Sequence, residues 1–292
     1  MQLINKNQRQ LRFKFLIILF LLLTILGCNN QEYPIEIKDG YTSTVLGLSS
    51  ISEFLSTYDL ISDLISSNEL FSSDNPPSLP LGTRFLAVDT SLIDGDGYEF
   101  LIDFGELGNL PLGTLCKDFK YRAGVLHVYL DQNYLNTSEM TIVLSSDHPF
   151  YSGDGKEMTQ LEGRIVLKQD SQKNMIVTGD DIQITNTQGH IELSTDIIIH
   201  ERETGSTNQS SKIISINGNM QLTNDGEKQD YTIVSPLLKK SDNSCIRHIL
   251  SGHIAINPFI ENMVIDFDPY SDSGCDNLIS LTVNGKRTFL NY

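Results

Sequence analysis

The stretch Gly189-His-Ile-Glu-Leu193 and the following Asp196-Ile-Ile-Ile-His200 decide the fold class of this chain. Polar and apolar residues alternate in the first, and the second is rich in isoleucine, a residue that favours strands. Alternation with a period of two places every second side chain on the same face of a strand. The two stretches therefore predict β-structure with one buried face.

Runs of this kind recur after Gly82, separated by Gly, Asn, Asp and Ser. They comprise residues 100–104, 125–130, 140–144, 164–168, 174–178, 182–185, 190–193, 196–200, 213–216, 220–222, 231–234, 247–250, 253–256, 263–267 and 278–283. Several begin with glycine, but at irregular intervals, whereas stacked solenoid repeats need a fixed period. Residues 81–292 are therefore predicted to form a mainly β domain of antiparallel hairpins, either a sandwich or a curved half-barrel.

One amphipathic helix is predicted before the sheet, over residues 50–71. Apolar residues recur there at intervals of three and four, and Ser50 and Glu53 have the spacing of a capping box at a helix N-terminus. The residues expected to be buried together are Phe54, Leu55, Tyr58, Ile61 and Ile65. Those expected to face water are Ser52, Ser56, Asp59, Asp63 and Ser66. Packing against the sheet is its expected role, with a lid over a cavity or a partner-docking helix as alternatives.

The first 27 residues have the features of a signal peptide. Residues 1–14 contain lysine and arginine but no acid, and an apolar run follows from Phe15 to Leu26. This run is shorter than the roughly 20 residues that a transmembrane helix needs. The tetrapeptide Ile25-Leu26-Gly27-Cys28 resembles the lipobox of bacterial lipoproteins. The resemblance implies cleavage before Cys28 and acyl chains on this cysteine, which anchor the protein to a membrane.

The predicted domain organisation follows from these segments. Residues 1–27 are the signal peptide, residues 28–49 the lipidated tether, residues 50–80 the helix with a proline-rich linker, and residues 81–292 the β domain. Asn29 stands where an aspartate would resemble an inner-membrane retention signal of some Gram-negative bacteria. We therefore expect a cell-envelope protein anchored in the outer membrane.

Charge and composition narrow the range of partners. The chain has 21 Lys and Arg residues against 37 Asp and Glu residues, a formal net charge of −16. An acidic protein without a basic cluster in its mature part repels phosphate backbones, so a nucleic-acid partner is not expected. The expected partners are the membrane, through the lipid anchor, and another envelope protein or a glycan. Tryptophan is absent, but the chain has 11 tyrosines, whose rings are able to stack on sugars.

Three cysteines follow Cys28, and export permits disulfides. A bridge between Cys245 and Cys275 would close a loop and stabilise the fold by about 3 to 4 kcal/mol in the chain-entropy model. Cys116 would then stay free. Three unpaired thiols are the alternative.

Familiar catalytic motifs do not occur in the sequence. His200-Glu201 begins like the helix motif of zinc proteases, but position 204 is Thr rather than a second His. No complete glycine-rich phosphate loop and no Gly-x-Ser-x-Gly elbow occur either. His248 and His253 flank a predicted turn and could meet across a hairpin, but they are two ligands, fewer than a zinc site needs. We therefore predict no catalytic residue and no cofactor.

The metal-binding candidates are incomplete ligand sets. His190 and Glu192 share a strand face but are two ligands, fewer than a zinc site needs. Asp94 and Asp96, in the loop of residues 93–97, offer oxygen ligands that suit calcium. Asp-Gly is also the commonest chemistry of a hairpin tip, so these two residues remain candidates without a complete loop.

The C-terminal segment carries a family resemblance. Its tail, Ile265-Asp-Phe-Asp268, Ser273-Gly-Cys-Asp-Asn277 and Leu281-Thr-Val-Asn-Gly-Lys286, resembles the ending of a broad family of uncharacterised β-rich bacterial envelope lipoproteins. Asp268 departs from the family pattern, which usually has glycine there. The resemblance spans roughly residues 85–292 and implies a lipoprotein, a β fold and an earlier cysteine partner for Cys275, but no activity.

These features favour a membrane-anchored envelope lipoprotein with a non-enzymatic binding or structural role. One alternative is a carrier of an amphiphilic ligand, in a half-barrel closed by the helix of residues 50–71. A second is an envelope hydrolase whose catalytic residues meet only in the folded chain.

Overall fold

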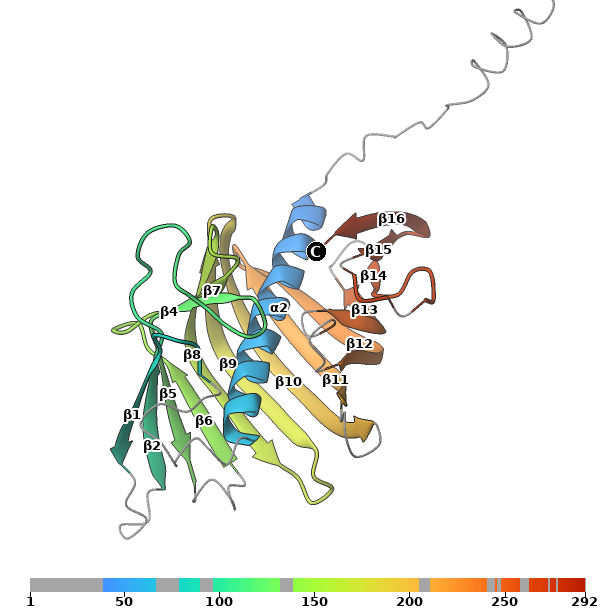
Figure 1. Cartoon of the computed structure of the whole chain (residues 1–292). Helices are drawn as coiled ribbons and strands as arrows, with labels where there is room; N and C mark the ends of the chain where they lie inside the picture. The colour runs from blue at the N-terminus through green and yellow to red at the C-terminus, as the bar shows by residue number, and fades with distance from the viewer. Residues whose placement is uncertain are drawn as a thin grey trace, which may run out of the picture. The chain divides into compact units, whose positions relative to one another are not determined.

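A computed structural model describes residues 39–66, 79–89, 97–131, 139–204, 211–240, 245, 248–257, 263–272, 274–276 and 278–291 (Figure 1). The predicted signal peptide, Cys28, residues 67–71 of the predicted helix, and the calcium candidates Asp94 and Asp96 lie outside these ranges. All described residues belong to one compact unit, Asp39–Tyr292.

Within the described ranges the chain forms one helix and one sheet of sixteen strands. The helix is α2 (Asp39–Ser66). The strands are β1 (Arg84–Asp89), β2 (Tyr98–Asp103), β3 (Thr114–Leu115), β4 (Tyr121–Ala123), β5 (Val125–Leu130), β6 (Glu139–Leu144), β7 (Phe150–Gly153), β8 (Met158–Gln169), β9 (Met175–Asn186), β10 (Gly189–Thr204), β11 (Ser211–Asn224), β12 (Glu227–Lys240), β13 (Ile249–Asn257), β14 (Met263–Asp266), β15 (Leu278–Val283) and β16 (Lys286–Asn291).

The sheet is open, and its hydrogen-bonded neighbours are antiparallel. Its main path runs β1-β2-β5-β6-β8 and then through β9 to β16 in sequence order, while β3, β4 and β7 form a side branch that joins at β8. The predicted mainly β fold with one preceding helix is confirmed. Because the strands form a single sheet that curves with α2 against one face, the half-barrel describes it and the sandwich does not (Figure 1).

Alternating burial places the core on the face that carries α2. In β5 and β6 every second residue is buried, beginning with Leu126 and Met140, and these side chains join residues of α2 in one apolar cluster. At Gly124 the chain turns into β5 with φ at 82°. A Cβ at this position would overlap the carbonyl oxygen of Pro149, so only glycine allows this close approach.

The helix begins earlier than predicted. It starts at Asp39, so residues 39–49, which we assigned to the tether, are helical. Ser50 is therefore not a capping residue, and its hydroxyl donates a hydrogen bond to the carbonyl oxygen of Leu46 one turn earlier, at 2.9 Å. The added turns bring Gly47 against β12, where a Cβ would overlap the hydroxyl of Tyr231. Tertiary packing thus extends a helix whose N-terminal turns carry little apolar periodicity.

The helix is also buried on more of its surface than an amphipathic helix would be. Phe54, Leu55, Tyr58 and Ile61 are buried as predicted. Ser56, predicted to face water, is buried as well, and Ser52 and Asp59 are half-buried. Burial or exposure was also predicted for Asp63, Ile65 and Ser66, whose side chains lie outside those that the structure describes. Ser56 is covered because β4 and the segment before it pack over the face of α2 that we expected to be open.

Among the described residues, no helix has both the length and the apolar character that crossing a bilayer requires.

Candidate functional site

Two groups of polar side chains stand out in the described structure. The first, which we name the buried ion-pair cluster, joins α2 to the segment around β4 and consists of Glu53, Cys116, Asp118, Lys120 and Arg122. The second, which we name the C-terminal surface cluster, lies on the outer face of β12 to β16 and consists of Ser235, His253, Asp266, Tyr270, Arg287 and Phe289.

Arg122 is the centre of the buried ion-pair cluster. Its side chain is fully buried, and its guanidinium donates two hydrogen bonds to the carboxylate of Asp118, at 2.8 and 2.5 Å. Nη2 also donates to the carbonyl oxygen of Ser56 on α2, at 3.2 Å. Beside it, Lys120 forms an ion pair with Glu53 on the helix, with Nζ 2.6 Å from Oε1. The cluster therefore ties α2 to the strand that covers it.

Burial and charge act against each other in this cluster. Burial would raise the pKa of Asp118, but the hydrogen bonds and positive charge of Arg122 outweigh it, so the pKa lies below its usual value. Burial also raises the pKa of the Cys116 thiol, and the Arg122 charge offsets only part of that shift. Cys116 is thus a buried neutral thiol, which lacks the thiolate that reactive cysteines need.

Two buried atoms of this cluster lack a hydrogen-bond partner among the described residues, Arg122 Nε and Glu53 Oε2. Arg122 is paired with Asp118 and Glu53 with Lys120, so both charges are compensated. Each side chain nevertheless keeps one buried atom without a hydrogen bond. An incompletely satisfied but paired buried charge is costly to disturb. The arrangement suits a structural connection between helix and sheet better than a binding site.

The C-terminal surface cluster begins as a row of polar side chains across three strands. Ser235 on β12 lies with its Oγ 2.7 Å from Nδ1 of His253 on β13, its partner in the strand register. His253 Nε2 is 3.5 Å from Oδ1 of Asp266 on β14. A donor and an acceptor at that separation are beyond an ordinary hydrogen bond, so Asp266 does not hold the imidazole closely.

Arg287 continues this row on β16. Its Nη2 donates to Asp266 Oδ2 at 2.9 Å, and its Nε donates to the hydroxyl of Ser280 at 2.8 Å. The guanidinium carbon lies 5.3 Å from the ring centroid of Phe289 on the same strand, within the range of a cation–π contact. The ring of Tyr270 stacks on Phe289, with centroids 5.5 Å apart and 16° between the planes.

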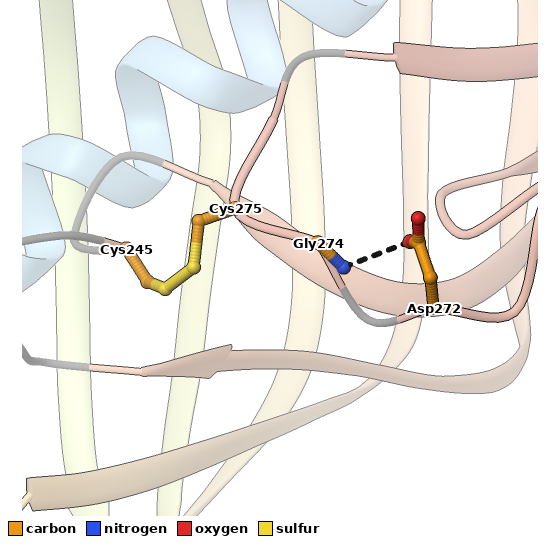
Figure 2. Close-up of a disulfide and its surroundings, with 4 residues drawn as sticks. All are labelled: Cys245, Asp272, Gly274 and Cys275. Carbon is orange, nitrogen blue, oxygen red and sulfur yellow. Dashed lines mark hydrogen bonds between the residues drawn. A yellow bond between two sulfur atoms is a disulfide. The ribbon is translucent and has the colours of Figure 1, made fainter.

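Tyr270 belongs to the loop between β14 and β15, which aspartates hold in shape. Asp266 Oδ1 accepts from the backbone N–H of Asp268, and Asp268 Oδ1 accepts from that of Asp272. Asp272 Oδ1 in turn accepts from the N–H of Gly274, as Figure 2 shows. Each aspartate thus closes a short turn with its own side chain, the ordinary chemistry of such residues in loops.

The predicted cysteine pair fastens the same loop. Cys275 is joined to Cys245 of the β12–β13 connection, with Cα atoms 5.1 Å apart (Figure 2). This separation lies inside the range for disulfides. Cys116 is left as a free thiol, as we expected, and it is buried.

The other predicted site residues do not assemble into a site. His190 lies exposed on β10 and contacts the hydroxyl of Thr185, and His200 contacts Asn174. Within the described ranges no three His, Cys, Asp or Glu side chains come close enough together to hold a metal ion. Cys28, Asp94 and Asp96 lie outside the described residues, so they remain predictions.

Sequence reasoning missed the residues that distinguish both clusters. Arg122 belongs to the segment Arg122-Ala123-Gly124, which fits the family resemblance, but the resemblance gave this arginine no role. Phe289 lies in a strand that we did not predict, and Tyr270 lies in the turn of the family-like tail. An aromatic residue in a loop of aspartates and serines was the available signal, because such a loop cannot bury a ring by itself.

The chain matches no known protein-family model, no curated protein sequence and no solved structure.

Proposed function

We propose that this protein is a lipid-anchored lipoprotein of the cell envelope with a non-enzymatic binding or structural role. The observation that carries the binding or structural role is the position of α2. The helix packs against the face of the curved sheet where a carrier would hold its ligand, and Phe54, Tyr58 and Ile61 are almost completely buried there. The side chains that remain exposed for binding are then those on the outer face of the sheet, which is suited to contact with a partner.

The anchor rests on the sequence alone. A basic start, a short apolar run and Gly27 before Cys28 together support cleavage and acylation at this cysteine. Two or three acyl chains give stable attachment, since a single chain binds membranes only marginally. The absence of aspartate at position 29 favours the outer membrane.

The carrier hypothesis meets a physical obstacle in the contacts of α2. A lid must open at low cost, but Glu53 is paired with Lys120, Asp59 with Lys239, and the backbone of Ser56 with buried Arg122. Lys239 is itself almost fully buried. Opening would expose apolar side chains and leave buried charges without partners, which places the helix among the more stable parts of the fold.

A hydrolase is the second candidate, and one observation favours it. Ser235, His253 and Asp266 lie in the order of a catalytic triad. The geometry opposes it, because His253 Nε2 stands 3.5 Å from Asp266 Oδ1 while the other carboxylate oxygen is held by Arg287. In working triads the aspartate holds the imidazole in the tautomer that activates serine, which needs a close hydrogen bond.

Metabolic labelling with an alkyne analogue of palmitate tests the anchor. We expect label on the full chain, its loss in Cys28→Ala, and accumulation of uncleaved precursor with globomycin. The matched control is Cys116→Ala, which should keep the label. Label that persists in Cys28→Ala would refute the lipoprotein assignment.

A fluorophosphonate probe tests the hydrolase alternative on the same preparation. A serine activated by His253 would react with the probe, and Ser235→Ala would abolish the reaction. We expect no labelling of the wild-type chain. Labelling that depends on Ser235 would replace the binding role with a catalytic one.

A further inference from the structure

We infer that the C-terminal surface cluster is a carbohydrate-binding site, in which the exposed ring of Tyr270, supported from behind by Phe289, stacks on a neutral pyranose. The inference rests on the proposed binding role and gives that role a ligand class. It is carried by exposed aromatic rings and hydrogen-bonding side chains that lie together on one face.

The two rings are exposed far beyond what packing requires. Tyr270 is 63% exposed and Phe289 is 45% exposed, although each stacks on the other. Leaving large apolar rings in water forfeits the free energy that burial would give. A ring face of a pyranose carries C–H groups, which an aromatic face covers well, and the ring edge of the sugar carries hydroxyls that stay available for hydrogen bonds.

Hydrogen-bonding groups border the rings on the side of the strands. Arg287 lies over Phe289, Asp266 holds Arg287, and His253 stands beyond it with 45% of its side chain exposed. Together they present charged donors and acceptors to a ligand that is held on the rings. Sugar hydroxyls both donate and accept, so they match such a mixed border.

The size of the apolar surface favours a sugar over a protein partner. An aromatic side chain offers about 150 to 250 Å² when fully buried. Two half-exposed rings would supply only part of the roughly 500 Å² that each partner buries in a specific protein–protein interface of about 1,000 Å². A surface of this size fits one or two sugar rings.

Charge narrows the ligand further. The chain has a formal net charge of −16, and Asp268 and Asp272 lie in the loop that carries Tyr270. Arg287, the cation of the cluster, is paired with Asp266. Nucleotides and sulfated sugars also stack on aromatic rings, but their negative charge is disfavoured here. A neutral oligosaccharide is able to stack on the aromatic surface and is not repelled by the negative charge of the protein.

The loop that presents Tyr270 is held before any ligand arrives. Its turns are closed by aspartate side chains, and Cys275 fastens it to Cys245 (Figure 2). Preorganisation removes part of the entropy cost of binding, which matters for a shallow surface with few contacts. We expect dissociation constants of about a millimolar for short oligosaccharides.

Saturation-transfer difference NMR on the full chain tests the inference, because it detects ligands that bind this weakly. The probes are maltotetraose, cellotetraose and chitotetraose, each measured against the wild-type chain and four variants. Tyr270→Ala and Phe289→Ala remove one ring each. Tyr270→Phe keeps the ring, and Phe119→Ala removes an aromatic side chain that is 53% exposed outside the cluster.

We expect transfer to the ring protons of at least one of these sugars. The affinity should fall about tenfold or more in Tyr270→Ala and Phe289→Ala, and stay within about twofold in Tyr270→Phe and Phe119→Ala. Thermal melts that match the wild type would show that the two alanine variants are folded.

No transfer from any of the three sugars, or transfer that survives the loss of either ring, would overturn the inference. A protein that co-purifies with the wild-type chain but not with Tyr270→Ala, without sugar binding, would assign the cluster to a protein partner instead. Acyl labelling at Cys28 is independent of these outcomes, so failure of the carbohydrate site and failure of the lipoprotein proposal are distinguishable.

Discussion

The buried ion-pair cluster and the C-terminal surface cluster both contain an arginine held by an aspartate, but in opposite surroundings. The side chain of Arg122 is 0% exposed, whereas that of Arg287 is 42% exposed. Water near Arg287 screens the charge and solvates it when its partner is lost. Water does not reach Arg122, so nothing solvates its charge when Asp118 is lost. The same chemistry is therefore structural in one place and available to a ligand in the other.

The contrast also separates stability from function. The cluster at α2 holds a helix against the sheet through contacts that water does not reach, so its loss should damage the fold. The cluster on β12 to β16 contributes little to the core, and its exposed rings have no packing role that requires their exposure. Substitutions in the two regions should accordingly affect different measurements.

The largest expected effect comes from the helix core. Phe54→Ala removes a side chain that is 0% exposed and should lower the free energy of unfolding by about 4 kcal/mol, since the cavity adds to the lost burial. Urea unfolding of the full chain measures this loss, with Ser49→Ala on the exposed side of α2 as the control. Near-wild-type stability would mean that α2 is a movable lid and would revive the carrier hypothesis.

The disulfide should contribute almost as much. Replacing both Cys245 and Cys275 by alanine frees a loop with a sequence separation of 30, which should cost about 3 to 4 kcal/mol in the chain-entropy model. Urea unfolding without reductant compares this double variant with the wild type. A reducing agent should bring the wild type to the same midpoint. A loss below about 1 kcal/mol would show that the loop is held mainly by its aspartates.

Removing the partner of the buried arginine should cost somewhat less. Asp118→Ala leaves Arg122 buried without its counter-charge, and we expect a loss of about 3 kcal/mol, because the 15% exposure of Asp118 admits some water. The control is the double variant Asp118→Ala with Arg122→Met, which removes both charges. It should be more stable than Asp118→Ala alone. Equal or lower stability of the double variant would contradict the role given to the pair.

The pH dependence of stability tests the same pair without removing it. Because Arg122 holds the pKa of Asp118 below 3.8, the unfolded chain takes up this proton first as the pH falls. The stability from Asp118 is therefore present above about pH 4 and is lost as the pH drops through the lowered pKa of the folded state. The urea midpoints of wild type and Asp118→Asn should stay apart above about pH 5 and converge as the pH falls below about 4. A constant difference would exclude this contribution.

The smallest expected effect belongs to the exposed pair. Asp266→Ala removes the partner of Arg287, yet stability should fall by less than about 1 kcal/mol, because water solvates the remaining charge. The matched measurement is Asp118→Ala in the same urea series. A loss as large as that of Asp118→Ala would mean that the surface cluster is structural, and it would weaken the case for a ligand there.

Some parts of the fold were predictable from local pattern. The runs 125–130 and 278–283 coincide with β5 and β15, since alternation of apolar and polar residues depends only on the strand itself. The edge strands β1 and β16 were not predicted. An edge strand has no neighbour on one side, so its residues are more exposed on both faces and lose the alternating signal, as Leu86 and Val88 do in β1.

The sequence by itself determined the mainly β fold and the helix before it, because each depends on periodicity along the chain. It favoured a bridge between Cys245 and Cys275 but left three unpaired thiols as an alternative, and the folded chain brings the two cysteines together. The tertiary structure decided that the sheet is single and curved, that Ser56 is buried, and that Tyr270 meets Phe289. These contacts join residues far apart in sequence, and they exist only once the path of the sheet is set. No local pattern encodes that path, since strand order and curvature follow from the packing of all strands together.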